Sequence, residues 1–278
     1  MRLLLFNSGP VATLASGDIN SPLTGTDMSD TESLVLDGKN GILIDGDIVS
    51  KISHTEELAQ EFGTEDNSTL RVIDCKGKAI IPGFVDSHTH LLWGGDRANE
   101  MQLRHKGLSY SDIANSGGGI QKTVQLTRNI SHDSLTQLGK KRIKRALDFG
   151  TTTMECKSGY GLSLDSELKL LEVNQILSES TAMGIHSTWL GAHDVPRGVA
   201  MDDYVDELIH IQLPAVVDQG YANYADVFCE PGWFSLEHTE LIVSAASKLG
   251  LPSRLHVDEF ADGGGLQLAS ELGAISGD

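Results

Sequence analysis

The pattern of apolar and polar residues changes character near residue 79. Before that point the apolar residues form short runs separated by turn residues, which is typical of β-strands. In residues 41–52, two apolar arms flank an Asp45-Gly46 turn and predict a β-hairpin. Residues 16–32 are rich in Ser, Thr, Asp and Gly, and they predict a loop. We therefore expect residues 1–78 to form a small β-domain.

From residue 79 onward, short apolar runs alternate with longer segments of helical periodicity. The candidate strands are residues 79–88, 151–156, 186–192, 225–230, 253–257 and 274–276. Helices are expected over residues 133–148, with Ser131 as the N-cap and Gly150 as the stop, and over residues 166–178. This alternation favours a parallel sheet, either a closed barrel or an open doubly wound sheet.

The residues at the strand ends discriminate between these two folds. An open nucleotide-binding sheet is expected to have a glycine-rich turn after its first strand, whereas here the first strand ends in His88-Thr89-His90. Residues with catalytic potential also follow later strands, namely Tyr160, His193, His256 and Glu259. Because catalytic groups gathered from many strand ends are typical of barrels, we predict an α/β fold in which residues 79–278 belong to a (β/α)₈ TIM-type barrel. About six of its eight strands precede Asp278, so we expect the chain to be a C-terminally truncated fragment.

The charge balance limits the partners that the protein can have. The chain has 39 acidic and 21 basic residues, which gives a formal net charge of −18. Such a surface repels phosphate backbones and anionic lipids, so we expect neither nucleic acid nor a membrane as partner. An anionic small-molecule substrate would have to be held by a few local cations.

The cysteines and the N-terminus indicate the compartment. The three cysteines are far apart in the sequence and form no C-x-x-C pair, so no disulfide framework is predicted. The apolar start, residues 1–6, is too short for a secretory signal. We therefore expect a cytoplasmic protein.

The histidines provide the candidate metal site. Successive side chains alternate faces on a strand, so His88 and His90 are expected to project from the same side. Two converging imidazoles form half of a site for zinc, iron or nickel, although two histidines on a surface loop are the alternative. His256 ends another strand and would complete three ligands, which leaves a coordination position open. Glu259 follows three residues later, either above the metal or as an exposed loop carboxylate.

Several segments together resemble the imidazolonepropionase family of the amidohydrolase superfamily. Residues 82–90 are similar to the first-strand signature of the superfamily. The segments that resemble imidazolonepropionases in order and spacing are 91–97, 116–120, 157–162, 190–196, 226–230 and 255–260. The resemblance covers nearly the whole chain, and it implies the hydrolysis of 4-imidazolone-5-propanoate to N-formimino-L-glutamate in histidine degradation.

The resemblance also implies roles for individual residues. The implied ligands of one divalent metal ion, zinc first and iron second, are His88, His90 and His256. The implied substrate contacts are Arg97, Tyr160, His193 and Glu259, and Glu259 would also assist proton transfer as a catalytic residue. The family's fourth ligand, an aspartate after the eighth strand, has no counterpart here, and Asp278 is not expected to replace it. A further catalytic histidine of the family has no counterpart either.

Two other functions remain open from the sequence. The first is a different mononuclear amidohydrolase, such as an aminohydrolase that acts on a purine or guanidine-like ring. The second is a catalytically inactive module that uses the barrel scaffold for binding. The sequence does not decide the identity of the metal. It also does not decide the oligomeric state, for which a homodimer is one option.

Overall fold

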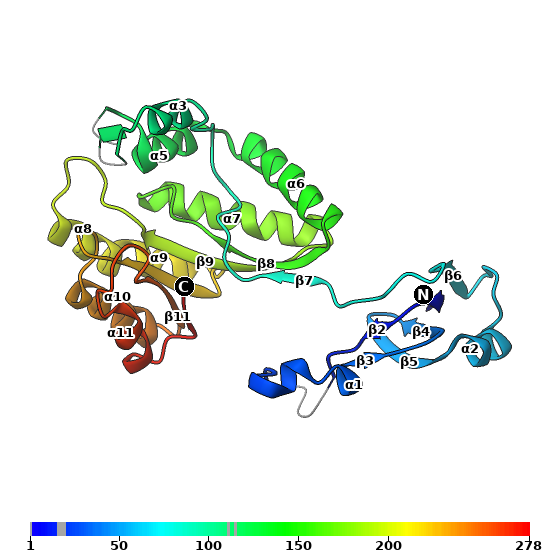
Figure 1. The fold of residues 1–278 in the computed structure, drawn as a ribbon. Coiled ribbons are helices and arrows are strands. Elements are labelled where there is room, and N and C mark those ends of the chain that lie inside the picture. The colour runs from blue at the N-terminus through cyan, green and yellow to red at the C-terminus, as the bar shows by residue number, and fades with distance from the viewer. Residues whose placement is uncertain (1, 16–20, 110–111, 114–115) are drawn as a thin grey trace. The chain divides into compact units, whose positions relative to one another are not determined.

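The computed structural model describes residues 2–15, 21–109, 112–113 and 116–278, and it forms two compact units, Met1–Gly83 and Phe84–Asp278 (Figure 1). The sequence pattern placed the boundary a few residues earlier, after residue 78. Residues 79–83 group with the first unit because the backbone of Ile80 is bonded to it. The amide of Ile80 donates to the carbonyl of Pro10, and its carbonyl accepts from the amide of Ala12, both at 2.9 Å.

The first unit contains a four-stranded sheet in the order β5-β4-β1-β6. Its strands are β1 (Arg2–Ser8), β4 (Asn40–Asp45), β5 (Ile48–His54) and β6 (Leu70–Asp74). The predicted hairpin is confirmed, because β4 and β5 pair antiparallel and Gly46 adopts a positive φ of 65° in the turn between them. Helix α2 (Thr55–Phe62) packs against the sheet. The core of the unit is formed by Leu4, Leu43, Leu58 and Leu70.

The prediction of a loop over residues 16–32 is partly wrong. Residues 16–20 lie outside the described residues, but η1 (Gly25–Ser29) is a 3₁₀-helix and α1 (Thr31–Leu34) is a short α-helix. The side chain of Asp30 accepts a hydrogen bond from the amide of Ser33 and so caps α1. Polar residues that indicate a loop are the same residues that cap helices, which explains the error. Strands β2 (Val11–Ala12) and β3 (Val35–Leu36) form a separate antiparallel pair.

The second unit is built on a six-stranded parallel sheet in the order β12-β11-β10-β9-β8-β7. Its strands are β7 (Phe84–Asp86), β8 (Thr151–Lys157), β9 (Gly184–Ala192), β10 (Tyr224–Cys229), β11 (Ser253–Val257) and β12 (Ser276–Gly277). Its helices are α3 (Glu100–His105), α5 (Gly119–Asn129), α6 (His132–Asp148), α7 (Leu164–Ser180), α8 (Met201–Glu207), the π-helical turn η2 (Leu208–Gln212), α9 (Leu213–Gln219), α10 (Leu236–Lys248) and α11 (Gly265–Glu271). Helices α6, α7, α10 and α11 pack against the strands (Figure 1). The predicted α/β fold with a barrel-type parallel sheet is thus confirmed.

The first barrel strand differs from the prediction. A buried strand was expected over residues 79–88, but β7 covers only Phe84–Asp86. The side chains of Phe84 and Val85 are 54% and 68% exposed. The reason is that β7 lies at the edge of the described sheet, where it pairs with β8. By contrast, α6 begins after Ser131 and Gly150 follows its end with a φ of 91°, as predicted.

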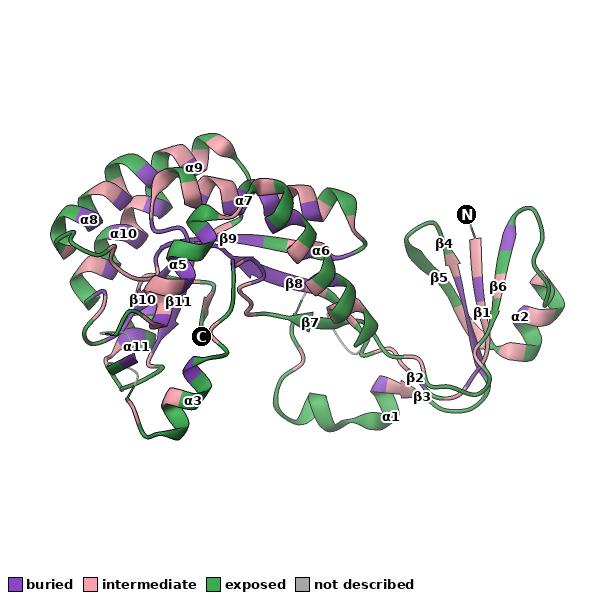
Figure 2. Cartoon of the chain, turned by 90° about the horizontal axis from the view of Figure 1, so that it is seen from above, coloured by how far each residue is buried: buried purple, intermediate pink, exposed green. Residues whose placement is uncertain are grey.

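The strands of the second unit divide apolar and polar residues between the two faces of the sheet. Alternate residues of β8, β10 and β11, such as Met154, Val227 and Leu255, belong to the hydrophobic core. Most of the residues between them are polar and largely buried, namely Glu155, Lys157, Asp226, Arg254 and His256. Figure 2 shows that β8 to β11 are mostly buried, whereas the helices are exposed on their outer sides. One face of the sheet therefore packs on the helices, and the other holds the polar residues.

Among the described residues, none of the helices combines the length and the apolar character that crossing a membrane requires.

Candidate metal and substrate site

The three histidines predicted to bind a metal lie close together. His88 and His90 follow β7, and His256 lies on β11. The nitrogen atoms that they offer as ligands all lie within 4.8 Å of one another. The ring centroids of His88 and His256 are 4.5 Å apart, and His90 lies 5.8 Å from each.

Thr89 holds the His88-Thr89-His90 segment against β8. Its carbonyl accepts a hydrogen bond from the amide of Lys157 at 2.9 Å, and its hydroxyl donates to the carbonyl of Glu155 at 2.5 Å. The segment therefore continues alongside β8 beyond the end of β7. Because Thr89 faces β8, the two histidines on either side of it project together toward His256.

The ring nitrogens show which atom of each imidazole is available. Nδ1 of His90 lies 3.3 Å from the carbonyl oxygen of Ser158, and Nδ1 of His256 lies 2.8 Å from Oδ2 of Asp226. Since a carbonyl and a carboxylate only accept hydrogen bonds, both Nδ1 atoms carry the hydrogen and both Nε2 atoms are left as ligands. Nδ1 of His88 contacts the carboxylate of Asp278.

The electrostatics of the cluster suit a metal site. Burial, followed by the neighbouring histidines, lowers the pKa of His90 well below its usual value, so this imidazole is neutral as a ligand must be. Burial also lowers the pKa of His256, but the Asp226 carboxylate outweighs this effect and the net shift is upward. Three imidazole donors within reach of one another fit a divalent ion such as zinc or iron.

Two of the predicted substrate contacts lie beside the metal histidines. The ring of Tyr160 is 5.1 Å from that of His90. The ring of His193 is stacked on His90, with centroids 4.8 Å apart and planes inclined by 15°. Nδ1 of His193 lies 2.9 Å from the carbonyl oxygen of Gly159, and burial is the main reason that its pKa falls to about 4. His193 is therefore a neutral imidazole with Nε2 left for a ligand.

The loop that carries Tyr160 is held by Glu167, a residue that the sequence analysis did not identify. Glu167 is fully buried in the first turn of α7. Its carboxylate accepts hydrogen bonds from the amides of Gly159 at 3.0 Å, Gly161 at 2.7 Å and Leu162 at 2.9 Å. Glu167 thus grips the loop on both sides of Tyr160.

We expect Glu167→Ala to lower the free energy of unfolding by at least about 2 kcal/mol, because it leaves buried amides without an acceptor and each costs about 1–3 kcal/mol. Urea denaturation measures this loss. Glu172→Ala is the matched control, since Glu172 is an exposed residue of the same helix, and we expect it to change stability by about 0.5 kcal/mol or less. Equal losses in the two variants would contradict the role assigned to Glu167.

The other two predicted residues, Arg97 and Glu259, have contacts with residues outside the histidine cluster. Nε of Arg97 is 3.8 Å from Oε2 of Glu100, the first residue of α3. Glu259 is exposed in the turn after β11, and its amide donates to Oε1 of Glu230. None of the contacts recorded between described residues joins the side chain of Arg97 or Glu259 to the histidines.

Buried polar residues around the histidines had no predicted role. Lys157 and Asp226 are nearly inaccessible to solvent and form an ion pair. Asp278 lies beside His88 and 3.3 Å from Nζ of Lys157. The sequence feature that could have indicated buried polar residues is the alternation within β8, where Glu155 and Lys157 alternate with the core residues Met154 and Cys156.

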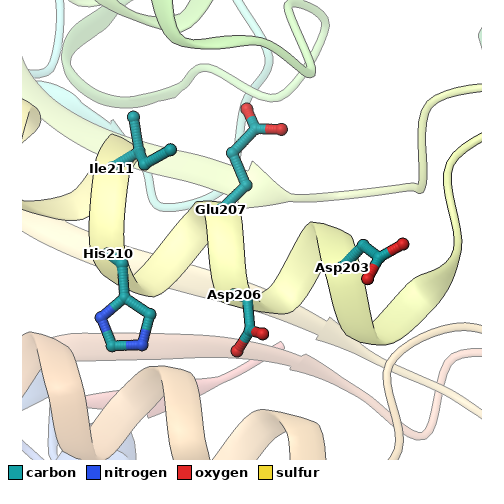
Figure 3. A pocket seen from close by; sticks show the side chains of 5 residues that line it. All are labelled: Asp203, Asp206, Glu207, His210 and Ile211. Carbon is teal, nitrogen blue, oxygen red and sulfur yellow. The ribbon is translucent and has the colours of Figure 1, made fainter.

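A surface pocket on α8 and η2 is separate from this site. Its volume is about 410 Å³, and its lining residues are Asp203, Asp206, Glu207, His210 and Ile211. Figure 3 shows that Asp206 and His210 leave the helix on one side, whereas Glu207 and Ile211 leave it on the other. The side chains do not converge on a common point, so we assign this pocket no function.

Comparison with known sequences identifies related proteins. The model of the amidohydrolase family matches residues 71–129. The chain is 42% identical over 259 residues to the imidazolonepropionase of Alkaliphilus metalliredigens, which covers 92% of this chain and 60% of that protein. It is 43% identical over 277 residues to the imidazolonepropionase of Symbiobacterium thermophilum, which covers 99% of this chain and 63% of that protein. The chain thus spans about 60% of the length of these relatives.

Comparison with solved structures identifies the fold. The 5-methylcytosine deaminase from Klebsiella pneumoniae, in its crystal structure with 5-fluorocytosine, superposes with a TM-score of 0.61 at 14% sequence identity. The match covers 98% of this chain and 55% of that chain. At this identity the likeness concerns the fold alone, and it shows that the chain shares the fold of that deaminase.

Proposed function

Because the chain shares the fold of the 5-methylcytosine deaminase and is related to imidazolonepropionases along nearly its whole length, we propose that it carries most of the active site of a metal-dependent cyclic amidohydrolase. The substrate is 4-imidazolone-5-propanoate, and the product is N-formimino-L-glutamate. The observation that supports this proposal best is the convergence of His88, His90 and His256, whose ligand atoms lie within 4.8 Å of one another.

His88, His90 and His256 would hold one divalent ion, zinc first and iron second. Bound there, such an ion supplies Lewis-acid chemistry, because it lowers the pKa of water and polarises a carbonyl group. Three protein ligands leave room for substrate or water, as in catalytic metal sites generally.

The residues around the histidines would bind the ring. Tyr160 and His193 lie beside His90, and Nε2 of His193 can accept a hydrogen bond because the ring hydrogen is on Nδ1, which faces the carbonyl of Gly159. During hydrolysis the carbonyl carbon of the ring gains the oxygen of a water molecule, and its bond to the ring nitrogen breaks. That nitrogen then receives a proton. Glu259, three residues after His256, would transfer the proton between the water and the nitrogen.

The direct test is an assay of the full-length protein, loaded with zinc or iron, on imidazolone propionate. We expect loss of the substrate and formation of N-formimino-glutamate. Release of ammonia from a purine or guanidine-like ring, without ring opening of imidazolone propionate, would favour the aminohydrolase alternative. Metal binding without turnover of either substrate would favour a binding module.

A second prediction concerns Arg97 and the propionate tail. A guanidinium matches a carboxylate with two parallel hydrogen bonds, which an ammonium group cannot reproduce. We expect Arg97→Lys to lower kcat/KM at least about tenfold, which corresponds to about 1.4 kcal/mol. Arg104→Lys is the control, since Arg104 is exposed on α3, and we expect it to leave kcat/KM unchanged. Unchanged kinetics of Arg97→Lys would remove Arg97 from the substrate site.

A further inference from the structure

Asp226 lies behind the metal histidines, on the polar face of the sheet. It is completely buried on β10, next to β11, which carries His256. In the parallel pairing of these strands Asp226 is opposite Arg254, and Phe228 is opposite His256. Asp226 and His256 therefore lie on the same face of neighbouring strands. Asp226 is two residues further than His256 from the carboxyl ends of these strands.

The carboxylate of Asp226 contacts His256 at two points. Oδ2 accepts the hydrogen of Nδ1 at 2.8 Å, and Oδ1 accepts the backbone N–H of His256 at 3.1 Å. One contact orients the imidazole ring and the other holds the backbone from which it extends. Together they leave the ring little freedom to rotate, and they direct Nε2 away from Asp226.

Lys157 contacts the same carboxylate oxygen, Oδ2, that accepts the hydrogen of His256 Nδ1. Its Nζ lies 2.6 Å from Oδ2 of Asp226 and 3.0 Å from Oε2 of Glu155, and its side chain is fully buried. Lys157 belongs to β8, so it reaches across the position of β9 in the sheet to meet Asp226. A buried carboxylate is stable only when it is paired and hydrogen-bonded, and Lys157 provides this pairing for Asp226.

We propose that Asp226 is a positioning residue that fixes His256 as the Nδ1–H tautomer with Nε2 directed at the metal ion, and that Lys157 holds Asp226 in place. This inference rests on the metal site of the proposed function. A histidine ligand commonly donates its other ring N–H to a carboxylate, and loss of that carboxylate typically lowers metal affinity about 10–100-fold.

The experiment compares metal affinity in the full-length protein by competition with a chelator, with Zn²⁺ as the probe and without substrate. We expect Asp226→Asn to weaken Zn²⁺ binding about 10–100-fold, because an amide NH₂ then replaces either Oδ2, which His256 Nδ1 and Lys157 share, or Oδ1, which accepts the backbone N–H of His256. Glu155→Gln is the matched control, since Glu155 pairs with Lys157 but does not contact His256, and we expect its Zn²⁺ affinity to stay within about twofold of wild type. Equal weakening in both variants would overturn the proposal, because the effect would then belong to the whole buried network.

A second measurement reads the tautomer of His256 directly and does not depend on activity. Long-range ¹H–¹⁵N spectra of metal-free protein at alkaline pH, where the ring is neutral, should show the hydrogen of His256 on Nδ1. In Asp226→Asn we expect a mixture of the two tautomers. The Nε2–H tautomer in the wild-type protein would overturn the proposal even if Asp226→Asn failed to fold. If the tautomer and the Zn²⁺ affinities follow expectation but imidazolone propionate is not hydrolysed, the positioning role stands and only the proposed reaction fails.

Discussion

Glu259→Gln is expected to lower turnover of imidazolone propionate by about 10²–10⁴-fold, the range in which general acid–base groups typically contribute. The amide keeps the size of the side chain but cannot accept a proton from water. The bound metal should remain, because Glu259 is proposed to transfer protons and not to bind the ion. Steady-state kinetics and metal analysis of the same full-length preparation measure both quantities.

The turn that carries Glu259 supports this prediction. Oε1 of Glu230 accepts the amide of Glu259, together with that of Phe260 at 3.4 Å. The preceding residue, Asp258, has a φ of 54° and caps the start of α11 through Gly263 at 2.9 Å and Leu266 at 3.1 Å. The backbone on both sides of Glu259 is therefore held in place, which suits a group that must meet a substrate atom.

The matched control for Glu259→Gln is Glu240→Gln, at an exposed position of α10, which should leave turnover unchanged. Loss of the metal from Glu259→Gln would show that Glu259 is a ligand, and undiminished turnover would exclude it from proton transfer.

His88→Ala is expected to remove the metal ion and to reduce hydrolysis to the background rate. A catalytic site with three protein ligands loses most of its affinity when one is removed, and the reaction depends on the ion. Elemental analysis should fall from about one ion per chain to nearly none. His105→Ala, in an exposed part of α3, should keep both metal and activity. Retention of the ion by His88→Ala would show that His88 is not a ligand and would remove the main support for the proposed function.

Local patterns predicted much of the second unit. The apolar periodicity located five of its strands and helices α6 and α7 to within a few residues, because burial of one face imposes a period on the sequence wherever the element lies. The limits of β7 were not predictable in this way. Ile80 and Ile81 are as apolar as strand residues, but Ile80 pairs with the first unit and the side chain of Ile81 is 55% exposed.

In the candidate site, too, some features follow from the local sequence and others only from the tertiary structure. The spacing of His88 and His90 alone predicts that they share a side, since alternation is a local property of an extended backbone. That His256 joins them, and that His193 stacks on His90, follows from the sequence only once parallel strands are assumed to end at a common edge.

By itself, the sequence determined the strand and helix alternation and the residue types at the strand ends. The tertiary structure alone decided which buried polar groups meet. Lys157 and Asp226 are 69 residues apart in the chain and come within 2.6 Å because of the order and register of the three neighbouring strands β8, β9 and β10. The carboxylate of Glu167 accepts hydrogen bonds from three backbone amides because α7 packs where the loop that carries Tyr160 turns. Periodicity is set by each residue's nearest neighbours along the chain, whereas register is set by the packing of whole elements, and the positions that support the histidines depend on register.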